Sequence, residues 1–385
     1  MLPLLAAPFR PFFWLAGLQA VISVPVYLTV LSGKTSLSSA TSPFVWHAHE
    51  MLYGYCAAVL AGFLLTATRA WTQRQTVGPL GTLLLVAIWL GARVISYFPA
   101  PARLSWVAAA DATLLCGTAL AIARPILLAR SWRNASFAPL LLLLAAANPF
   151  FPANRLIGSA TPTLPAVEIV IMIMVIFAGR IIPLFTRNAL SAIEVRQRDR
   201  RDDLALAANA AMLVPALFVV SPTVDRALSA LAGTSNLLRM VGWRSIACRR
   251  DALLLVLHLG YAWIVVAQLL RAWLGNDVAG RAIWLHAATL GAIGTLTLAM
   301  LARVSLGHTG RPLRAGRLMT LAFACLLGAV LARISIPTAV RCGADPHWLL
   351  TSYWTATGLW SVAFALYLLR YTPMLFSPRV DGKTG

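Results

Sequence analysis

The amino-acid sequence predicts an all-α protein, a polytopic transmembrane helical bundle of about twelve spans with both termini in the cytoplasm. Of the 385 residues, 59% are hydrophobic and only 11% are charged, whereas about a quarter of an average soluble domain is charged. Apolar runs that are long enough to cross a hydrocarbon core of about 30 Å recur throughout the chain. Because backbone polar groups in lipid must be satisfied within the segment, we expect these runs to be helices.

The apolar runs predict the individual spans and the domain organisation. We expect spans near 9–31, 45–68, 79–98, 104–128, 136–152, 164–186, 203–221, 223–243, 252–273, 281–304, 317–340 and 348–371. Together they predict a single transmembrane domain over residues 1–385, with six spans within 1–190, a polar cytoplasmic linker at 191–203 and six spans within 204–385. The segment 223–243 carries several polar residues and is alternatively an interfacial helix.

The charge distribution predicts the orientation of the chain in the membrane. Together with the cysteine pattern, it also argues against some classes of ligand. Lys and Arg number 32 against 12 Asp and Glu, for a net charge of +20. With a cytoplasmic N-terminus, most of the basic residues fall on the inner side, as the positive-inside rule requires. Such an excess is typical of cytoplasmic loops facing anionic lipid, and we expect no nucleic-acid partner. The five cysteines form no CxxC or CxxCH motif, which excludes a c-type haem site.

Titratable side chains gather at one depth of the predicted bundle. The stretch WHAHE places His47, His49 and Glu50 at the outer end of the second span, with depth taken from a rise of about 1.5 Å per residue. A membrane-buried ionisable group is costly unless it is paired, hydrated or coordinated. The cluster therefore predicts a functional site. Arg93 and Asp111 are interpreted equally well as a buried ion pair with a structural role only. Also in the outer half are Glu168, His286 and Arg333.

A second, smaller group is predicted near the cytoplasmic ends of the spans. His258 lies among leucine and valine in the ninth span, and His308 lies just past the tenth. The inner end of the sixth span, with Arg180 and Arg187, is near them by topology. His347, just outside the twelfth span, is a weaker candidate.

The HAH pair predicts metal chemistry. Residues two apart on a helix point about 200° apart, so His47 and His49 could serve two centres, as the His-x-His of haem–copper oxidases does. In an unwound helix start they could instead chelate one copper. Glu50 and Tyr53 follow His47 and His49 by three and four residues, which places one polar neighbour on each face. Imidazole is the usual membrane-buried ligand of haem iron and copper; histidines that serve helix packing are the alternative.

Several ordered blocks of the sequence resemble the NnrS family. They are PFRPFF, WHAHEMLYGY with AGFLLTA, GRIIPLFTRN, LHLGYAW, LHAATLGAIGT, GHTGRPL and RYTPMLFSPRVDGKTG. The resemblance implies a multi-pass protein of the bacterial cytoplasmic (inner) membrane that carries haem, with copper also reported, and that is linked to denitrification and defence against nitric oxide. It carries over onto the matching positions His47, His49, Glu50, Arg180, Arg187, Asn188, His258, His286 and His308.

One function that fits these residues is a haem redox enzyme that reduces nitric oxide to nitrous oxide. His286 and one histidine of HAH could hold haem b, and the other histidine a second haem or copper. Glu50, Tyr53 and Glu168 would carry protons from the outer side. Arg93 or Arg333 would pair with haem propionates, because guanidinium matches carboxylate as a fork. Electrons would come from quinol or an external donor.

The other function that fits is non-enzymatic. A haem-binding or nitric-oxide-binding carrier or sensor would use the same histidines, and buried acids also line the paths of transporters. However, the two halves of the sequence show no convincing repeat, which argues against the transporter. The carboxylates and the tyrosine beside the histidines favour chemistry, because storage needs no proton donor.

Overall fold

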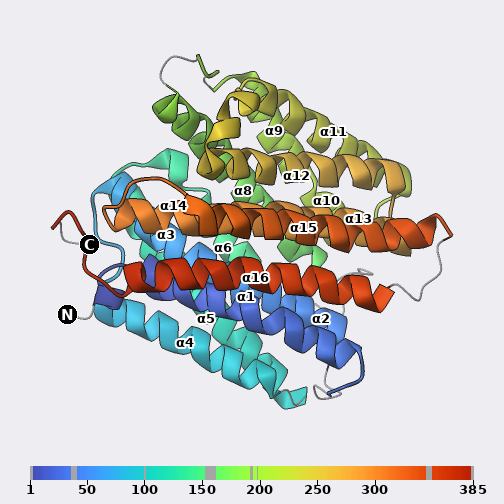
Figure 1. Cartoon of the computed structure of the whole chain (residues 1–385), viewed down its shortest axis with the longest axis horizontal. Coiled ribbons are helices and arrows are strands. Elements are labelled where there is room, and N and C mark those ends of the chain that lie inside the picture. The colour runs from blue at the N-terminus through green and yellow to red at the C-terminus, as the bar shows by residue number, and fades with distance from the viewer. Residues whose placement is uncertain are drawn as a thin grey trace. The chain divides into compact units, whose positions relative to one another are not determined.

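The computed structural model describes residues 3–35, 41–98, 101–151, 162–190, 194–196, 198–343 and 349–382. Within these ranges every regular element is a helix (Figure 1). The all-α class predicted from the sequence is therefore confirmed for the described part of the chain.

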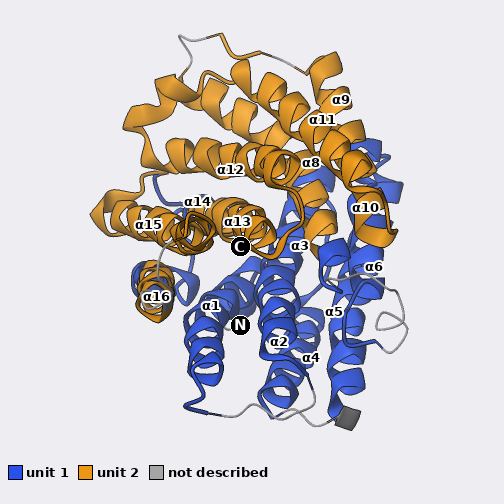
Figure 2. Ribbon diagram, turned by 90° about the vertical axis from the view of Figure 1, so that its right-hand side faces the viewer, with its two compact units in different colours: residues 1–166, 304–312, 364–385 blue, residues 167–303, 313–363 orange. Residues whose placement is uncertain are grey.

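The chain forms two compact units, each built from segments that are distant in sequence (Figure 2). Unit 1 comprises residues 1–166, 304–312 and 364–385, and unit 2 comprises residues 167–303 and 313–363. The helices α14 (Thr295–His308) and α16 (Leu349–Leu375) contribute residues to both units. The single transmembrane domain with a linker at 191–203 stays a prediction, and residues 191–193 and 197 of that linker lie outside the described residues.

Unit 1 is built mainly from the first part of the chain. Its helix α1 packs against α2, η2 and α3, and α5 packs against α3, α4 and α6. Ser42 accepts a hydrogen bond from the Phe44 amide and Pro43 follows it, which defines the start of α2. The elements are α1 (Phe9–Leu31), α2 (Pro43–His49), η2 (Glu50–Cys56), α3 (Ala57–Thr72), α4 (Pro79–Tyr97), α5 (Pro101–Leu128) and α6 (Phe137–Ala146).

Unit 2 is centred on α12, which packs against α11, α13 and η5. Helix starts here are capped by aspartates: Asp199, Asp251 and Asp277 each accept backbone N–H groups of the following turn. The elements are α8 (Leu164–Ala189), α9 (Arg200–Ala211), α10 (Leu213–Leu217), α11 (Pro222–Val241), η4 (Ser245–Arg250), α12 (Ala252–Leu274), α13 (Val278–His286), η5 (Ala287–Gly294) and α15 (Gly316–Arg341).

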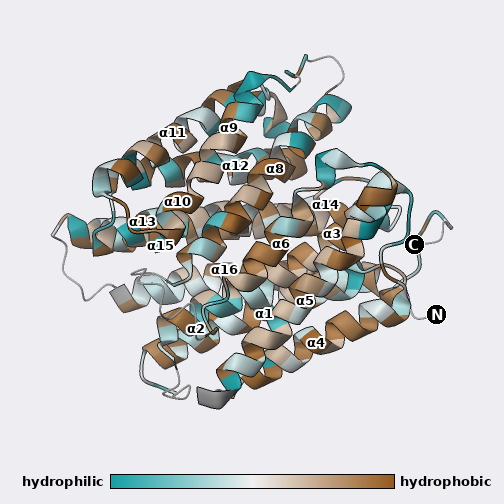
Figure 3. Ribbon diagram, turned by 180° about the vertical axis from the view of Figure 1, so that it is seen from behind, coloured by the Kyte–Doolittle hydropathy of each residue, from teal (hydrophilic) through white to brown (hydrophobic). Residues whose placement is uncertain are grey.

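Eight helical stretches of the described chain are long and apolar enough to cross a membrane. They are Phe9–Leu31, Pro43–Thr72, Pro79–Tyr97, Arg103–Leu128, Leu164–Ala189, Ala252–Leu274, Val278–His308 and Gly316–Arg341. Large hydrophobic side chains of α4, including Leu80, Leu84 and Val94, are exposed, and Figure 3 shows hydrophobic residues along much of α4 and α5. These features indicate a multi-pass membrane protein.

The other four predicted spans are helical but differ from the expectation. The span at 136–152 becomes the ten-residue α6, and that at 203–221 divides into the short helices α9 and α10. The twenty-residue α11 and the 27-residue α16 are long, but they are not among the eight stretches above. The predicted count of spans and the cytoplasmic termini stay predictions.

Two of the spans contain a π-helix directly after a histidine. The π-helix η2 begins at Glu50, after His49, and η5 begins at Ala287, after His286. π-helical turns are rare and occur frequently at functional sites. This irregularity draws attention to the same two motifs, WHAHE and LHAATLG, that the sequence singles out.

Candidate functional site

The most densely charged buried site lies in unit 1, around His49. Its Nδ1 is 3.1 Å from Glu50 Oε1, and its Nε2 is 2.9 Å from Asp111 Oδ2. All three side chains are completely buried. The imidazole is stacked on Phe150 at 3.9 Å between ring centroids and on Tyr53 at 5.1 Å. The ring orientation is therefore held from both faces and both edges.

Arg93 closes this group into a ring of four side chains. Its Nη1 donates to Glu50 Oε1 at 2.7 Å, and its Nη2 forms an ion pair with Asp111. The Arg93–Asp111 pair considered from the sequence is thus present, as one side of a larger network. Arg93 was expected to bind haem propionates, but here the guanidinium already serves two carboxylates of the chain. We call His49, Glu50, Arg93 and Asp111 the ionic ring.

The charges of the ionic ring depend on the protonation of His49. Because carboxylates only accept hydrogen bonds, His49 makes both contacts when both ring nitrogens carry a proton. Two carboxylates, one guanidinium and one imidazolium then sum to zero. Loss of the His49 proton leaves one uncompensated negative charge inside the protein.

Neutral donors complete the surroundings of Glu50. Ser96 Oγ donates to Oε1 at 2.6 Å, and Gln19 Nε2 donates to Oε2 at 2.7 Å. A Cβ on Gly54 would lie 2.8 Å from Gln19 Nε2 and 3.0 Å from Arg93 Nη1, so a glycine makes room for these donors. Sequence reasoning missed Gln19 and Ser96; the only signal was a lone polar residue within an apolar helix.

The contacts of Glu50 correct one expectation from helical spacing. Glu50 was assigned to the face of His47, but its carboxylate hydrogen-bonds to His49. Arg93 and Ser96 both donate to Glu50 Oε1 and hold the carboxylate on the side of His49. The expected contact between His49 and Tyr53 is present, and the Tyr53 hydroxyl donates to the Leu144 carbonyl at 2.9 Å.

His47 lies on another face, as the two-residue spacing predicts. It is half-buried and stacks on Tyr27 of α1, with 4.1 Å between the ring centroids and 15° between the planes. His49 instead meets α5 and the segment after α6. The two histidines of HAH therefore have separate surroundings.

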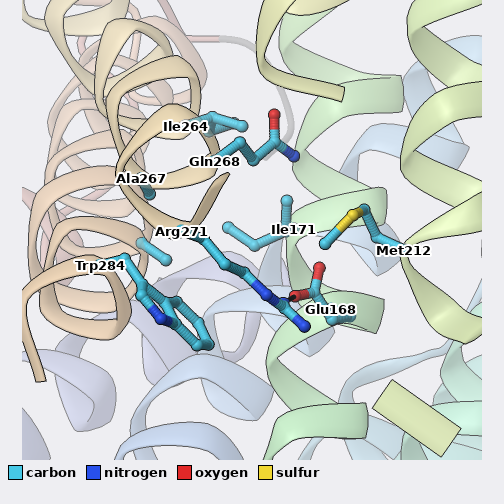
Figure 4. Close-up of a pocket in the computed structure, with 9 residues that line it drawn as sticks. Glu168, Ile171, Met212, Ile264, Ala267, Gln268, Arg271 and Trp284 are labelled. Carbon is cyan, nitrogen blue, oxygen red and sulfur yellow. Dashed lines mark hydrogen bonds and ion pairs between the residues drawn. The ribbon is translucent and has the colours of Figure 1, made fainter. Parts of the chain in front are cut away.

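Glu168 belongs to a second ionic group, in unit 2. Arg271 Nη1 donates to Glu168 Oε1 at 2.7 Å, and its Nη2 donates to Asp225 Oδ1 at 2.5 Å. Figure 4 shows Arg271 and Glu168 among the residues that line a small cavity. The volume of this cavity is about 20 Å³, which is room for about one water molecule. The Arg271 guanidinium also lies 4.6 Å from the Trp284 ring centroid. The expected proton role of Glu168 stays a prediction.

A chain of hydrogen bonds runs between α11 and α12 in unit 2. Arg239 Nη1 donates to the Tyr261 hydroxyl at 3.2 Å, and Tyr261 donates to Asn236 Oδ1 at 2.5 Å. Asn236 Nδ2 then donates to Gln268 Oε1 at 2.9 Å, and Gln268 Nε2 to Asn209 Oδ1 at 2.7 Å. Every donor points to the next acceptor, so this chain stabilises helix packing.

His286, also in unit 2, is the histidine whose tautomer suits a metal. Its Nδ1 lies 2.8 Å from the Ala282 carbonyl. Because a carbonyl cannot donate, Nδ1 carries a proton, and in the neutral ring the lone pair is then on Nε2. Ligating imidazoles usually have this arrangement, with the second nitrogen bonded to a carbonyl or carboxylate.

His258 is a histidine with protein partners on both nitrogens. Ser245 Oγ is 2.9 Å from Nδ1, while Thr186 Oγ1 and Cys248 Sγ are 3.0 and 3.4 Å from Nε2. Burial raises the pKa of the Cys248 thiol, so this thiol carries its proton at neutral pH. The contact with Thr186 agrees with the predicted proximity to the inner end of the sixth span.

The remaining candidates are spread over both units. In unit 1, the His308 ring lies 5.5 Å from that of Phe9. In unit 2, Arg180 is half-buried, Arg187 is exposed at the end of α8, and Arg333 lies over the Tyr353 ring at 4.7 Å. His347 falls outside the described residues.

No group of three or more His, Cys, Asp or Glu side chains is arranged to hold a metal ion within the described ranges. Haem needs only one or two axial ligands, so a single histidine with a suitable nitrogen can hold it. His286 fits by its tautomer. His49 does not fit in this arrangement, because both of its nitrogens face carboxylates.

The fold and the site define a class: a multi-pass helical membrane protein with ionisable groups buried inside its spans. The chain belongs to the NnrS family, since the family model described as NnrS protein matches residues 3–379. No curated protein matches the sequence.

Proposed function

We propose that this NnrS-family chain is a haem protein of the bacterial inner membrane that reduces nitric oxide to nitrous oxide. Two molecules of nitric oxide, two electrons and two protons give one nitrous oxide and one water. The observation that carries the proposal is the ionic ring, which holds a titratable imidazole between two carboxylates inside the membrane-spanning part of unit 1. Such buried groups are typical of proton transfer.

His286 would hold the haem through Nε2, with Nδ1 fixed by the Ala282 carbonyl. His47 is the candidate in HAH for a second haem or copper, because His49 is engaged by the ring. A bound haem would supply an iron that binds nitric oxide and accepts electrons. A quinol or an external protein would donate those electrons.

The residues of the ring would handle protons. His49 can release one as neutral imidazole, and Glu50 Oε1 is the acceptor beside its Nδ1. Arg93 and Ser96 fix that oxygen, so its position does not change while the proton moves. Phe150 and Tyr53 keep the imidazole plane in place.

A carrier or sensor that binds nitric oxide without turnover is the second candidate. It is favoured by the completeness of the ring, in which each carboxylate oxygen of Glu50 already has a donor. In a carrier or sensor, the ionic ring would hold the helices together and would not transfer protons.

The test is a reduced-minus-oxidised spectrum of purified protein, with metal analysis and nitrous oxide measured after adding nitric oxide and reductant. We expect haem bands that respond to nitric oxide and a reductant-dependent release of nitrous oxide. His286→Ala should remove the haem bands, whereas Thr289→Val, one turn along the same span, should keep them. Haem that binds nitric oxide without product would favour the carrier, and absence of haem in the wild type would reject both.

A further inference from the structure

Five arginines are buried in the described chain, and one of them differs from the rest. Four donate to protein oxygen atoms: Arg93 and Arg271 each to two carboxylates, Arg239 to Asp202 and the Val175 carbonyl, and Arg10 to the carbonyls of Leu375 and Ser377. The fifth, Arg303 of α14, is only 9% exposed. Among the described residues it has no hydrogen-bond or ion-pair partner.

Phe185 of α8 holds the Arg303 guanidinium. The Cζ atom lies 3.9 Å from the ring centroid, which is a close cation–π contact. This contact orients the planar fork but satisfies none of its N–H groups. None of the guanidinium nitrogens is completely sealed from the surroundings, so a ligand atom can reach them.

No carboxylate of the described residues forms an ion pair with Arg303. Asp251 is close enough to act on it electrostatically, but Asp251 Oδ1 accepts the Leu253 and Leu254 amides at 2.9 and 3.2 Å. It therefore caps α12. Arg250, which precedes Asp251 in the sequence, is exposed.

We propose that Arg303 and Phe185 form a binding site for an oxyanion, phosphate or carboxylate, carried by an amphiphilic ligand of the membrane. A buried guanidinium without acceptors is costly, and its fork matches phosphate or carboxylate in a bidentate way. The Phe185 ring offers an apolar surface beside the charge. The oxyanion has two chemical sources, the headgroup of an anionic lipid or a haem propionate.

The experiment compares full-length wild type with Arg303→Gln, using Arg250→Gln as the matched control for loss of one exposed positive charge. Binding of phosphatidylglycerol and of phosphatidylcholine is measured by native mass spectrometry and by the shift of the thermal midpoint. Haem content and haem reduction potential are measured on the same samples. We expect wild type and Arg250→Gln to prefer phosphatidylglycerol, and Arg303→Gln to lose about tenfold to hundredfold in affinity.

The two sources give different results. Lost lipid preference with unchanged haem identifies a headgroup, and changed haem content or potential with unchanged lipid binding identifies a propionate. A folded Arg303→Gln that matches wild type in both overturns the proposal. Should Arg303→Gln not fold, Arg303→Lys and Phe185→Leu replace it, and wild-type behaviour of both overturns the site. If the wild type holds no haem, the proposed function fails while the lipid measurement still decides this inference.

Discussion

His49 Nε2 lies 2.9 Å from Asp111 Oδ2, a contact that joins the end of α2 to α5. Both residues are completely buried, and Asp111 also pairs with Arg93. Removing one partner of a buried ion pair leaves a charge without compensation, which is more harmful than removing the whole pair.

Asp111→Asn should therefore lower the free energy of unfolding by about 3–5 kcal/mol, measured by denaturant unfolding in detergent. The control is Asp203→Asn, because Asp203 is exposed and pairs with Arg198 at the surface; its effect should stay within about 1 kcal/mol. Equal effects of the two substitutions would show that the ionic ring contributes no more to the free energy of unfolding than an ion pair at the surface does.

Glu50→Gln should retain haem but slow nitrous oxide formation by about 10²–10⁴-fold, the usual contribution of a positioned proton donor or acceptor. An amide keeps the shape of the side chain but cannot accept the His49 proton as a carboxylate does. Glu194→Gln, at an exposed position, should turn over like wild type. Unchanged turnover in Glu50→Gln would make Glu50 a structural residue.

Gly54→Ala should destabilise the ionic ring, because the new Cβ would lie 2.8 Å from Gln19 Nε2 and 3.0 Å from Arg93 Nη1. We expect a loss of about 1–3 kcal/mol in unfolding free energy. Gly91 of α4 has nothing within 4 Å of its added Cβ, so Gly91→Ala should gain up to about 1 kcal/mol from helix propensity. A neutral Gly54→Ala would mean that the two donors can shift without cost.

Tyr261→Phe should interrupt the hydrogen-bond chain between α11 and α12, because the hydroxyl both accepts from Arg239 and donates to Asn236. Thermal unfolding should report a loss of about 1–3 kcal/mol. Tyr371 is also buried, but its hydroxyl has no partner in the described part of the chain. Tyr371→Phe should consequently be neutral, and similar losses from both would argue against a role of the chain in stability.

Asp277 precedes α13, the helix that ends in His286. The stability that Asp277 gives to the start of this helix should depend on pH. Hydrogen bonds from the Gly280 amide and from Arg341 lower the pKa of Asp277 from its ordinary value of 3.8. A lowered pKa in the folded state means that the stabilisation is complete above the unfolded value and is lost as pH falls through the folded value. The difference in unfolding midpoint between wild type and Asp277→Asn should shrink below pH 3.8; a difference independent of pH would contradict this.

Much of the fold could be predicted because each span depends on local composition. The spans at 9–31, 79–98 and 252–273 match helices of the structure within two residues. The prediction was weaker at 136–152 and 203–221, which form short helices, because the length of an apolar run does not fix where a helix ends. The π-helices after His49 and His286 have no signature in hydrophobic spacing. The placement of Glu50 on the face of His47 was wrong because Arg93 and Ser96 hold its carboxylate beside His49.

The candidate site could be predicted as a set of residue types but not as a set of contacts. WHAHE and Arg93 were recognisable, since charged groups are conspicuous in apolar runs. Their partner donors Gln19 and Ser96, and the exceptional position of Arg303, depend on how helices distant in sequence are rotated against one another.

By itself, the sequence determined a helical membrane protein of the NnrS family and the ionisable residues that its spans carry. This is possible because the free energy of placing a segment in lipid depends mainly on the residues of that segment. Only the tertiary structure decided that His49 lies between Glu50 and Asp111, that His286 carries its proton on Nδ1, and that Arg303 meets a ring instead of a carboxylate. Those contacts depend on the packing and rotation of whole helices, and on local π-helical turns, which no single segment encodes.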